Sequence, residues 1–315
     1  MYIYLEGNFY ALREIFIILC YNTVTLPPKP AEKSICSTRR KTMKKITLLD
    51  GASGTMLWNM AAAEGTEKMP VWKYNVTAPR LVERLALEYL AAGSEIIYSN
   101  TFCANPPAAK ADGCSFEAII DAGVSIAKDA ARGFCTKVAL DFGPLTEALE
   151  PFGGITEEEY RDCFRRMCRR GAAAGADLIV LETFMDGRSL KIAAEEAAET
   201  GLPLMCSLSF AKNNRTFFGT GIDEILEGIS GLGPMAIGLN CSFGPLDAQP
   251  VIEEFSQKTD IPLLLKPNTA DMGPEDFAKA VEPSLPKVSF LGACCGSDPS
   301  YIRALRQTAL DGKIV

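Results

Sequence analysis

Three cysteines near the ends of two predicted strands give this sequence its clearest chemical signal. Cys241 ends the run AIGLNC, and Cys294 and Cys295 end the run FLGACC further along the chain. The chain has no histidine, so sulfur would have to hold any soft divalent metal bound here. Three thiolates suit zinc and leave the fourth tetrahedral position open, as in catalytic zinc sites. An open position beside thiolates suits a substrate that is itself a thiol.

The alternative is that these cysteines are structural, because free cysteine is among the most buried residue types. Adjacent cysteines strain the geometry of a disulfide, which argues against a bond between Cys294 and Cys295. Neighbouring residues of a regular strand also point to opposite faces, so both sulfurs cannot face one site unless the backbone turns. Gly292 and Gly296 flank the pair, and glycine permits the unusual backbone angles that such a turn needs.

Composition limits the classes of protein that the chain can belong to. Its 315 residues are 48% hydrophobic, which is enough for a large core, and its net charge is −7. Because there is no basic stripe, we expect no nucleic-acid partner. The eleven cysteines are an odd number in a long chain without a visible secretory signal. This pattern favours reduced thiols and a cytoplasmic location over a disulfide framework.

The first 42 residues differ from the rest and are predicted to be a poorly ordered extension or the product of a mis-assigned start site. Their apolar run IFIILCY is shorter than the ~20 residues that span a bilayer, and no cleavage pattern follows it. We therefore expect no membrane partner, although a weak membrane-surface contact is the alternative. Residues 43–315 are predicted to form a single domain.

Eight short apolar runs in residues 43–315 are typical of buried parallel strands. Helical patterns lie between them, several of which end at glycine, and Thr156 with Glu159 matches a capping box. Eight strand–helix units predict an α/β fold, the (β/α)8 TIM barrel, whose usual size is about 250 residues. A doubly wound open sheet is the alternative, but GASGT after the first strand lacks the full dinucleotide pattern. The predicted strands are residues 46–50, 95–100, 137–141, 178–182, 204–210, 236–241, 262–268 and 289–294.

Polar residues recur where these strands end. Active sites of (β/α)8 barrels lie at the carboxyl-terminal face of the strands. A single such residue can be a loop cap or a turn former, but the same pattern at seven strand ends indicates a site. The residues are Asp50, Asn100, Asp141, Glu182, Cys241, Asn268 and Cys294.

A series of short motifs runs along the chain in the order DGASGTML, MPVWKYNVTAP, SNTF, DFGP, LETF, FFGTG, GLNCSFGP, KPNT and GACCGSDP. Through these motifs the sequence resembles the homocysteine S-methyltransferase family over roughly residues 44–312, and most closely the homocysteine-binding module of cobalamin-dependent methionine synthase. The pair GLNCSFGP and GACCGSDP is the most specific feature of the resemblance. Ser53 stands where the family often has a bulkier residue, and Ala293 where glycine is usual.

The resemblance implies that Cys241, Cys294 and Cys295 bind Zn²⁺, which takes the sulfur of homocysteine as a thiolate. It also implies that the substrate's amino group is held by Asp50 and Glu182. Backbone N–H groups around Gly51, Ala52 and Ser53 are expected to receive the substrate's carboxylate, as small-residue turns can. Asn100 and Asn240 are expected to support the substrate site.

The resemblance leaves the methyl donor open. The folate, cobalamin and reactivation modules of methionine synthase are not in the sequence, so we expect a separate methylcorrinoid protein to be the donor and partner. The alternative is direct transfer to homocysteine from S-methylmethionine, S-adenosylmethionine or betaine. Two other classes are a non-catalytic scaffold that binds zinc and thiols, and a Schiff-base lyase that uses Lys266 in the seventh predicted strand.

Overall fold

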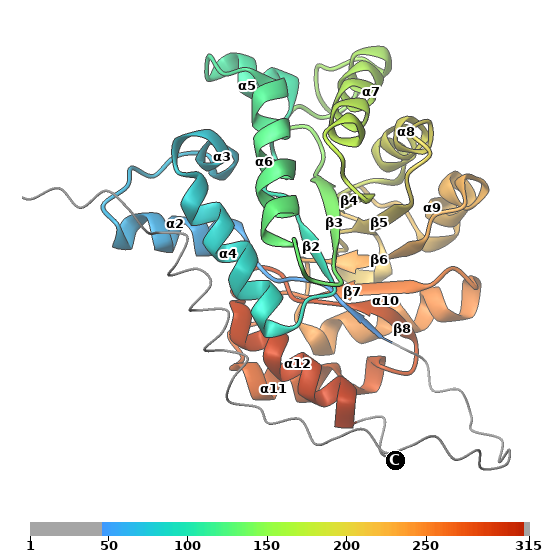
Figure 1. The fold of residues 1–315 in the computed structure, drawn as a ribbon. Helices are drawn as coiled ribbons and strands as arrows, with labels where there is room; N and C mark the ends of the chain where they lie inside the picture. The colour runs from blue at the N-terminus through green and yellow to red at the C-terminus, as the bar shows by residue number, and fades with distance from the viewer. Residues whose placement is uncertain (1–45, 312–315) are drawn as a thin grey trace, which may run out of the picture. The chain divides into compact units, whose positions relative to one another are not determined.

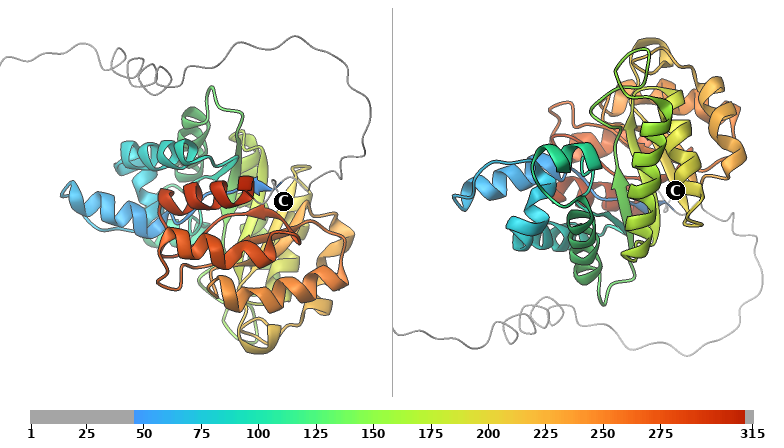
Figure 2. Two further views of the ribbon diagram at one scale, coloured as in Figure 1. Left: turned by 90° about the horizontal axis from the view of Figure 1, so that it is seen from below. Right: turned by 90° about the horizontal axis from the view of Figure 1, so that it is seen from above.

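The computed structural model describes residues 46–311, so the predicted extension 1–42 and the first residues of the predicted domain lie outside the described part. Eight strands alternate with helices along this part of the chain. The helices lie outside the strands (Figures 1 and 2). The strands are β1 (Thr47–Leu48), β2 (Ile96–Tyr98), β3 (Lys137–Phe142), β4 (Leu178–Phe184), β5 (Leu204–Leu208), β6 (Ala236–Asn240), β7 (Leu263–Lys266) and β8 (Val288–Leu291).

Most of the outer layer consists of one main helix after each strand. Short helices are inserted before α4 and before α6, and 3₁₀ turns extend several of the loops. The α-helices are α2 (Gly54–Ala63), α3 (Tyr74–Thr77), α4 (Pro79–Ala92), α5 (Pro106–Ala111), α6 (Phe116–Ala130), α7 (Glu157–Ala173), α8 (Gly187–Ala198), α9 (Ile222–Ile229), α10 (Pro245–Lys258), α11 (Pro274–Val281) and α12 (Pro299–Asp311). The 3₁₀ helices are η1 (Val71–Lys73), η2 (Lys212–Asn214), η3 (Ser230–Leu232) and η4 (Glu282–Ser284).

All strand pairs are parallel, and their order is β1-β8-β7-β6-β5-β4-β3-β2. Strands β1 and β2 come together at the seam of this nearly closed barrel, where the N–H of Glu95 donates to the carbonyl of Leu48 at 2.7 Å. A side chain also bridges the seam, because Asp50 Oδ2 accepts from the N–H of Tyr98 at 2.7 Å. The predicted (β/α)8 barrel is confirmed, and the alternative of a doubly wound sheet is wrong.

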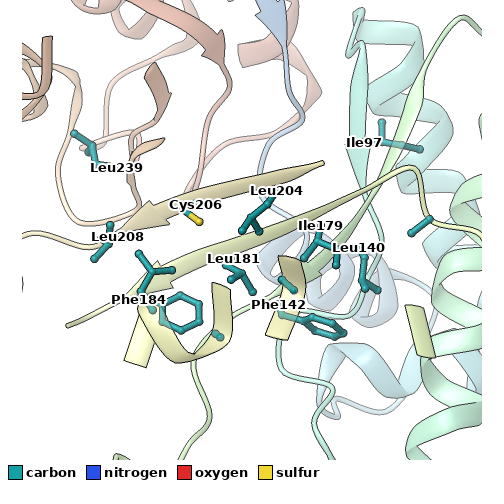
Figure 3. Packing of buried hydrophobic residues seen from close by; sticks show 14 of the residues in the cluster. Ile97, Leu140, Phe142, Ile179, Leu181, Phe184, Leu204, Cys206, Leu208 and Leu239 are labelled. Carbon is teal, nitrogen blue, oxygen red and sulfur yellow. The ribbon is translucent and has the colours of Figure 1, made fainter. Parts of the chain in front are cut away.

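Two apolar layers follow from the alternation of side chains along the strands. One face of each strand packs against the helices in the larger buried cluster. Figure 3 shows side chains of this cluster, among them Leu140, Ile179 and Cys206. The opposite face forms a separate cluster made mainly of strand residues, which fills the inside of the barrel. This inner cluster comprises Leu49, Ile96, Tyr98, Ala139, Leu178, Val180, Met205, Ala236, Leu264 and Phe290.

The inner cluster turns polar at the carboxyl-terminal end of the strands. Continuing the two-residue alternation from Ala139, Val180, Ala236 and Leu264 leads to buried polar side chains. A layer of charged and hydrogen-bonding groups therefore lies next to the apolar inner cluster, at the carboxyl-terminal end of the strands, where (β/α)8 barrels have their active sites. These groups are Asp141, Glu182, Asn240 and Lys266.

The predicted capping box at the start of α7 is confirmed. Thr156 Oγ1 accepts from the N–H of Glu159 at 3.3 Å, and Glu159 Oε2 accepts from the N–H of Thr156 at 2.9 Å. We expect Thr156→Ala to lower the free energy of unfolding by about 1 kcal/mol, the usual value for an N-cap side chain. Urea unfolding checks this, with Thr156→Ser as the control. Equal stability of the two variants would contradict the role of the hydroxyl group.

Helix α2 (Gly54–Ala63), directly after β1, was not predicted. Its sequence GTMLWNMAAA has no acidic residue in the first turn and no side-chain cap, so the usual start signals are absent. Every helix within residues 46–311 is too short or too polar to cross a membrane.

Candidate active site

The sulfur atoms of Cys241, Cys294 and Cys295 lie within 4.8 Å of one another at the carboxyl-terminal end of the barrel. Cys241 Sγ and Cys295 Sγ are 3.4 Å apart. Cys241 and Cys294 are partly buried, whereas Cys295 is exposed. The loops after β6 and β8 therefore bring together the three thiols that the sequence singled out, with one side open to solvent.

Cys241 has a left-handed backbone that its neighbours stabilise. Its φ is +64°, an uncommon value for a residue other than glycine. Its N–H donates to the carbonyl of Lys266 at 3.0 Å, and Asn268 Nδ2 donates to its carbonyl at 2.7 Å. These bonds from β7 and the loop after it fix the direction of the Cys241 side chain.

Asn240, directly before Cys241, is fully buried and connects three strands. Its Oδ1 accepts from the N–H of Thr183 at 2.8 Å and from Ser207 Oγ at 2.9 Å, and its Nδ2 donates to Thr183 Oγ1 at 2.7 Å. Thr183 has a φ of +63° within an irregularity of β4. Asn240 thus shapes the ends of β4 and β6.

The two glycines that flank the cysteine pair are needed for different reasons. Gly296 has a φ of +87°, as expected for a turn that presents both sulfurs. Gly292 is not among the residues of positive φ, so the prediction of unusual backbone angles is wrong at this position. Gly292 is required for space instead, since a Cβ there would lie 2.6 Å from the carbonyl oxygen of Asp50.

The three-thiol cluster fits a zinc ion. Tetrahedral ligands at about 2.3 Å from a zinc ion lie roughly 3.8 Å apart, and the three sulfurs already lie within 4.8 Å of one another. Hydrogen bonds from the thiols of Cys241 and Cys294 lower the pKa of Cys295. The hydrogen bonds to Cys241 and Cys295 raise the pKa of Cys294 well above its usual value, so the cluster without a cation favours negative charge on only one of its sulfurs.

A buried ion cluster lies beside the sulfurs. Lys266 Nζ is 3.1 Å from Asp50 Oδ1 and 3.6 Å from Glu182 Oε2. It also lies 3.7 Å from the centre of the Tyr98 ring, within the range of a cation–π contact. All four residues are less than a tenth exposed, so Lys266 neutralises carboxylates that solvent screens poorly.

Asp141 belongs to the same cluster. Burial raises its pKa well above the usual value, and the carboxylate of Glu182 raises it further. Burial likewise raises the pKa of Glu182, although Lys266 opposes the shift. For Lys266, burial lowers the pKa, but Glu182, Tyr98 and Asp50 together raise it above that of a free lysine. A lysine held in the protonated state is a poor nucleophile, which argues against the Schiff-base lyase.

The turn after β1 is already engaged within the protein. The N–H of Ala52 donates to Ser297 Oγ at 3.0 Å, and its carbonyl accepts from Tyr89 Oη at 2.8 Å. A Cβ on Gly51 would lie 2.7 Å from both hydroxyl oxygens. Ser53 precedes α2 without a side-chain capping bond. The N–H of Ala52 is therefore not free for the substrate's carboxylate in this structure.

Asn100 lies in the loop after β2 and contacts the η1–α3 segment. Its Nδ2 donates to the carbonyl of Val71 at 2.8 Å and to Asn75 Oδ1 at 2.9 Å. Its contacts are those of a residue that supports the loop.

The remaining described cysteines do not join the cluster. Cys163, Cys168 and Cys206 are buried in the layer between strands and helices. Cys103 is exposed in the loop after β2.

Fold and site together define a class of enzyme: a (β/α)8 barrel with a thiol cluster and a charged layer at its carboxyl-terminal face. The chain belongs to the homocysteine S-methyltransferase family, because residues 47–309 match the profile described as Homocysteine S-methyltransferase. The predicted family and the predicted enzyme class, methyl transfer to a thiol, are thereby confirmed.

Two characterised relatives have modest identity to this chain. Homocysteine S-methyltransferase 2 of Arabidopsis thaliana is 28% identical over 287 residues, which are 76% of this chain and 86% of that protein. Methionine synthase of Mycobacterium leprae is 26% identical over 303 residues, which are 82% of this chain but only 24% of that protein.

Solved structures of the homocysteine methyltransferase MmuM from Escherichia coli share the fold. The oxidised form has a TM-score of 0.74 at 22% identity and covers 83% of this chain and 95% of its own. The metallated form has a TM-score of 0.72 at 22% identity and covers 84% and 96%.

Proposed function

We propose that this enzyme methylates homocysteine to methionine with a zinc ion held by Cys241, Cys294 and Cys295. The observation that carries the proposal is the convergence of these three sulfurs within 4.8 Å at the open end of the barrel. The metallated form of the MmuM structure supports a metal in a protein of this fold. When bound, zinc supplies the Lewis acidity that keeps a coordinated thiol deprotonated at neutral pH.

The protein's own residues bind and orient the substrate. Asn240 and Asn268 hold the backbone around Cys241, so the sulfurs are positioned before the substrate arrives. The carboxylates of Asp50 and Glu182 give the neighbouring layer the negative charge that attracts the α-ammonium group of homocysteine. When its amino group is bound in this layer, homocysteine can reach the cysteine cluster with its thiol.

The methyl donor in this proposal is a methylcorrinoid carried by a separate protein. Similarity to methionine synthase supports this route. Exposed apolar side chains on the loops after β3, β4 and β5 offer a large donor a contact surface. The rings of Phe152 and Phe218 pack against each other with their centres 5.3 Å apart and their planes tilted by 44°, and the N–H of Phe218 donates to the carbonyl of Met185 at 3.2 Å.

The donor is tested with zinc-loaded protein and homocysteine. Methylcobalamin, a methylated corrinoid protein, S-methylmethionine, S-adenosylmethionine and betaine are added in separate reactions, and methionine is measured. We expect the corrinoid donors to be used and the small cationic donors to be inactive. Phe152→Ser is expected to slow transfer from the corrinoid protein and to leave transfer from free methylcobalamin unchanged.

Rapid methionine formation from S-methylmethionine, S-adenosylmethionine or betaine would overturn the corrinoid route but leave homocysteine methylation in place. Protein that binds zinc and homocysteine but transfers no methyl group from any donor would support the scaffold alternative.

A further inference from the structure

Lys266 lies between the two carboxylates that the proposed function assigns to the amino group of the substrate. Its Nζ donates to Asp50 Oδ1 at 3.1 Å and is 3.6 Å from Glu182 Oε2. The lysine is only 3% exposed, so these carboxylates rather than water compensate its charge. The free protein therefore holds an ammonium group of its own where the ammonium group of the substrate would be received. We call this place the first position.

A second position for an ammonium group exists in the same layer. Asp141 Oδ1 and Tyr98 Oη are buried and take part in no hydrogen bond. Both atoms can accept a hydrogen bond, and a buried polar atom without a partner is costly. Tyr98 pairs with Ala139 in the parallel register, and Asp141 follows Ala139 by two residues on the inner face of β3. The two open atoms therefore belong to inward-facing side chains of neighbouring strands.

The ring of Tyr98 connects the two positions. Lys266 Nζ lies 3.7 Å from the centre of this ring, which carries the open hydroxyl group. Burial and the charge of Glu182 raise the pKa of Asp141, whereas the charge of Lys266 lowers it, so the lysine and Asp141 are within electrostatic range of each other. A lysine ammonium group sits on a flexible four-carbon chain. It can therefore turn toward the second position without a change in the backbone of β7.

The arrival of a second ammonium group favours such a turn. The buried layer contains the carboxylates of Asp50, Asp141 and Glu182. If Lys266 stayed in the first position, two ammonium groups would share Asp50 and Glu182, and Asp141 would remain without a cation. Like charges at short range repel strongly where water is excluded. With Lys266 beside Asp141, each ammonium group has a carboxylate partner of its own.

We propose that Lys266 has two positions and thereby determines the specificity of the site. In the free protein it lies between Asp50 and Glu182. When the ammonium group of the substrate binds there, Lys266 moves to the second position beside Asp141 Oδ1 and Tyr98 Oη. This proposal rests on the proposed function and deepens it, because it assigns to Lys266 the discrimination between thiols with and without an amino group.

The first experiment compares two thiols in the absence of a methyl donor. Zinc-loaded protein is titrated by calorimetry with L-homocysteine and with 4-mercaptobutyrate, which is homocysteine without its amino group. Only homocysteine displaces Lys266, and in Asp141→Asn the lysine has no charged partner to move to. We therefore expect Asp141→Asn to weaken homocysteine binding roughly 10- to 100-fold and to change 4-mercaptobutyrate binding by less than about twofold. Asp260→Asn is the control, because Asp260 is exposed, lies before β7 at the opposite end of the strands, and loses the same charge.

The Lys266→Met background separates a role of Asp141 through the lysine from direct binding of the substrate. Without the lysine the first position is open, so homocysteine should bind at least as tightly as it does to the unaltered protein. Adding Asp141→Asn should then change homocysteine affinity by less than about threefold, because the two substitutions act through one group and are non-additive. An Asp141→Asn loss of the same size in both backgrounds would overturn the proposal.

A crystal structure of the unaltered zinc-loaded protein with homocysteine bound tests the movement without a variant that could fail to fold. We expect Lys266 Nζ to lie within hydrogen-bond distance of Asp141 Oδ1 and no longer of Asp50 Oδ1. A lysine that keeps its bond to Asp50 in this complex would refute the two positions, as would equal affinity of the unaltered protein for the two thiols. Failure of the proposed function is a separate result. Displacement of Lys266 by homocysteine without methyl transfer from any donor would refute the methylation and leave the two positions standing.

Discussion

Cys294→Ala protein should bind less than about a tenth of the zinc that the unaltered protein binds, which we expect to be about one ion per chain. Zinc affinity depends on the number and the arrangement of the ligands that the protein supplies. Loss of one of the three sulfur ligands should therefore weaken zinc binding strongly. Removing a residue that only supports a metal ligand usually lowers affinity or activity 10- to 100-fold. We therefore expect loss of the ligand itself to lower methyl transfer at least roughly a hundredfold.

Metal analysis after dialysis, paired with homocysteine calorimetry, measures this effect. Cys103→Ala is the control, because it removes a thiol at the same end of the barrel that lies outside the cluster. Cys241→Ala should behave like Cys294→Ala, since both sulfurs belong to the cluster. Full zinc content together with unchanged homocysteine affinity in Cys294→Ala would refute the three-thiol site.

The sequence predicted the barrel well because its strands are buried on both faces. Continuous runs such as LIVLE and LLLK leave little ambiguity between strand and loop, and each of the eight predicted runs overlaps one observed strand. The cysteine cluster was also predictable, since only a few residue types bind zinc and the chain has no histidine. For Cys241, Cys294 and Cys295, residue type and position at strand ends carried the prediction.

The polar contacts inside the barrel could not be predicted in the same way. Asp50 and Glu182 were expected to face the substrate, but the sequence does not show that Lys266 on β7 reaches between them. Asp141 was recognised at a strand end and left without a role, because its importance depends on which oxygens its neighbours occupy. Such details arise from side-chain packing across several strands rather than from the pattern within one.

The alternation of inward-facing and outward-facing side chains along each strand still indicated part of these polar contacts. Lys266 follows Leu264 by two residues, and Asp141 follows Ala139 by two, so each charged side chain shares a face with an apolar residue of the inner cluster. A charged residue on the inner face of a barrel strand has to find a partner or a ligand there. Reading the strands by face as well as by their ends would have placed Asp141 and Lys266 together.

Lys266→Met is expected to destabilise the protein by about 3–5 kcal/mol, the usual effect of removing one partner of a buried ion pair. Methionine keeps the length of the side chain and its contact with the Tyr98 ring, but leaves Asp50 and Glu182 without a cation. Urea unfolding measures the change. Lys287→Met is the control, because the Lys287–Glu253 pair lies at the surface and such pairs contribute about 0–1 kcal/mol.

The double variant Lys266→Met/Asp50→Asn separates loss of charge from loss of packing. If the penalty comes from an uncompensated carboxylate, neutralising Asp50 as well should recover part of the lost stability, and the two substitutions should be non-additive by more than about 1 kcal/mol. Recovery will be incomplete, because Glu182 remains charged and Asp50 also accepts the Tyr98 N–H that closes the β1–β2 seam. Strictly additive effects, or a Lys266→Met protein as stable as the Lys287→Met control, would show that Lys266 does not neutralise the carboxylate layer.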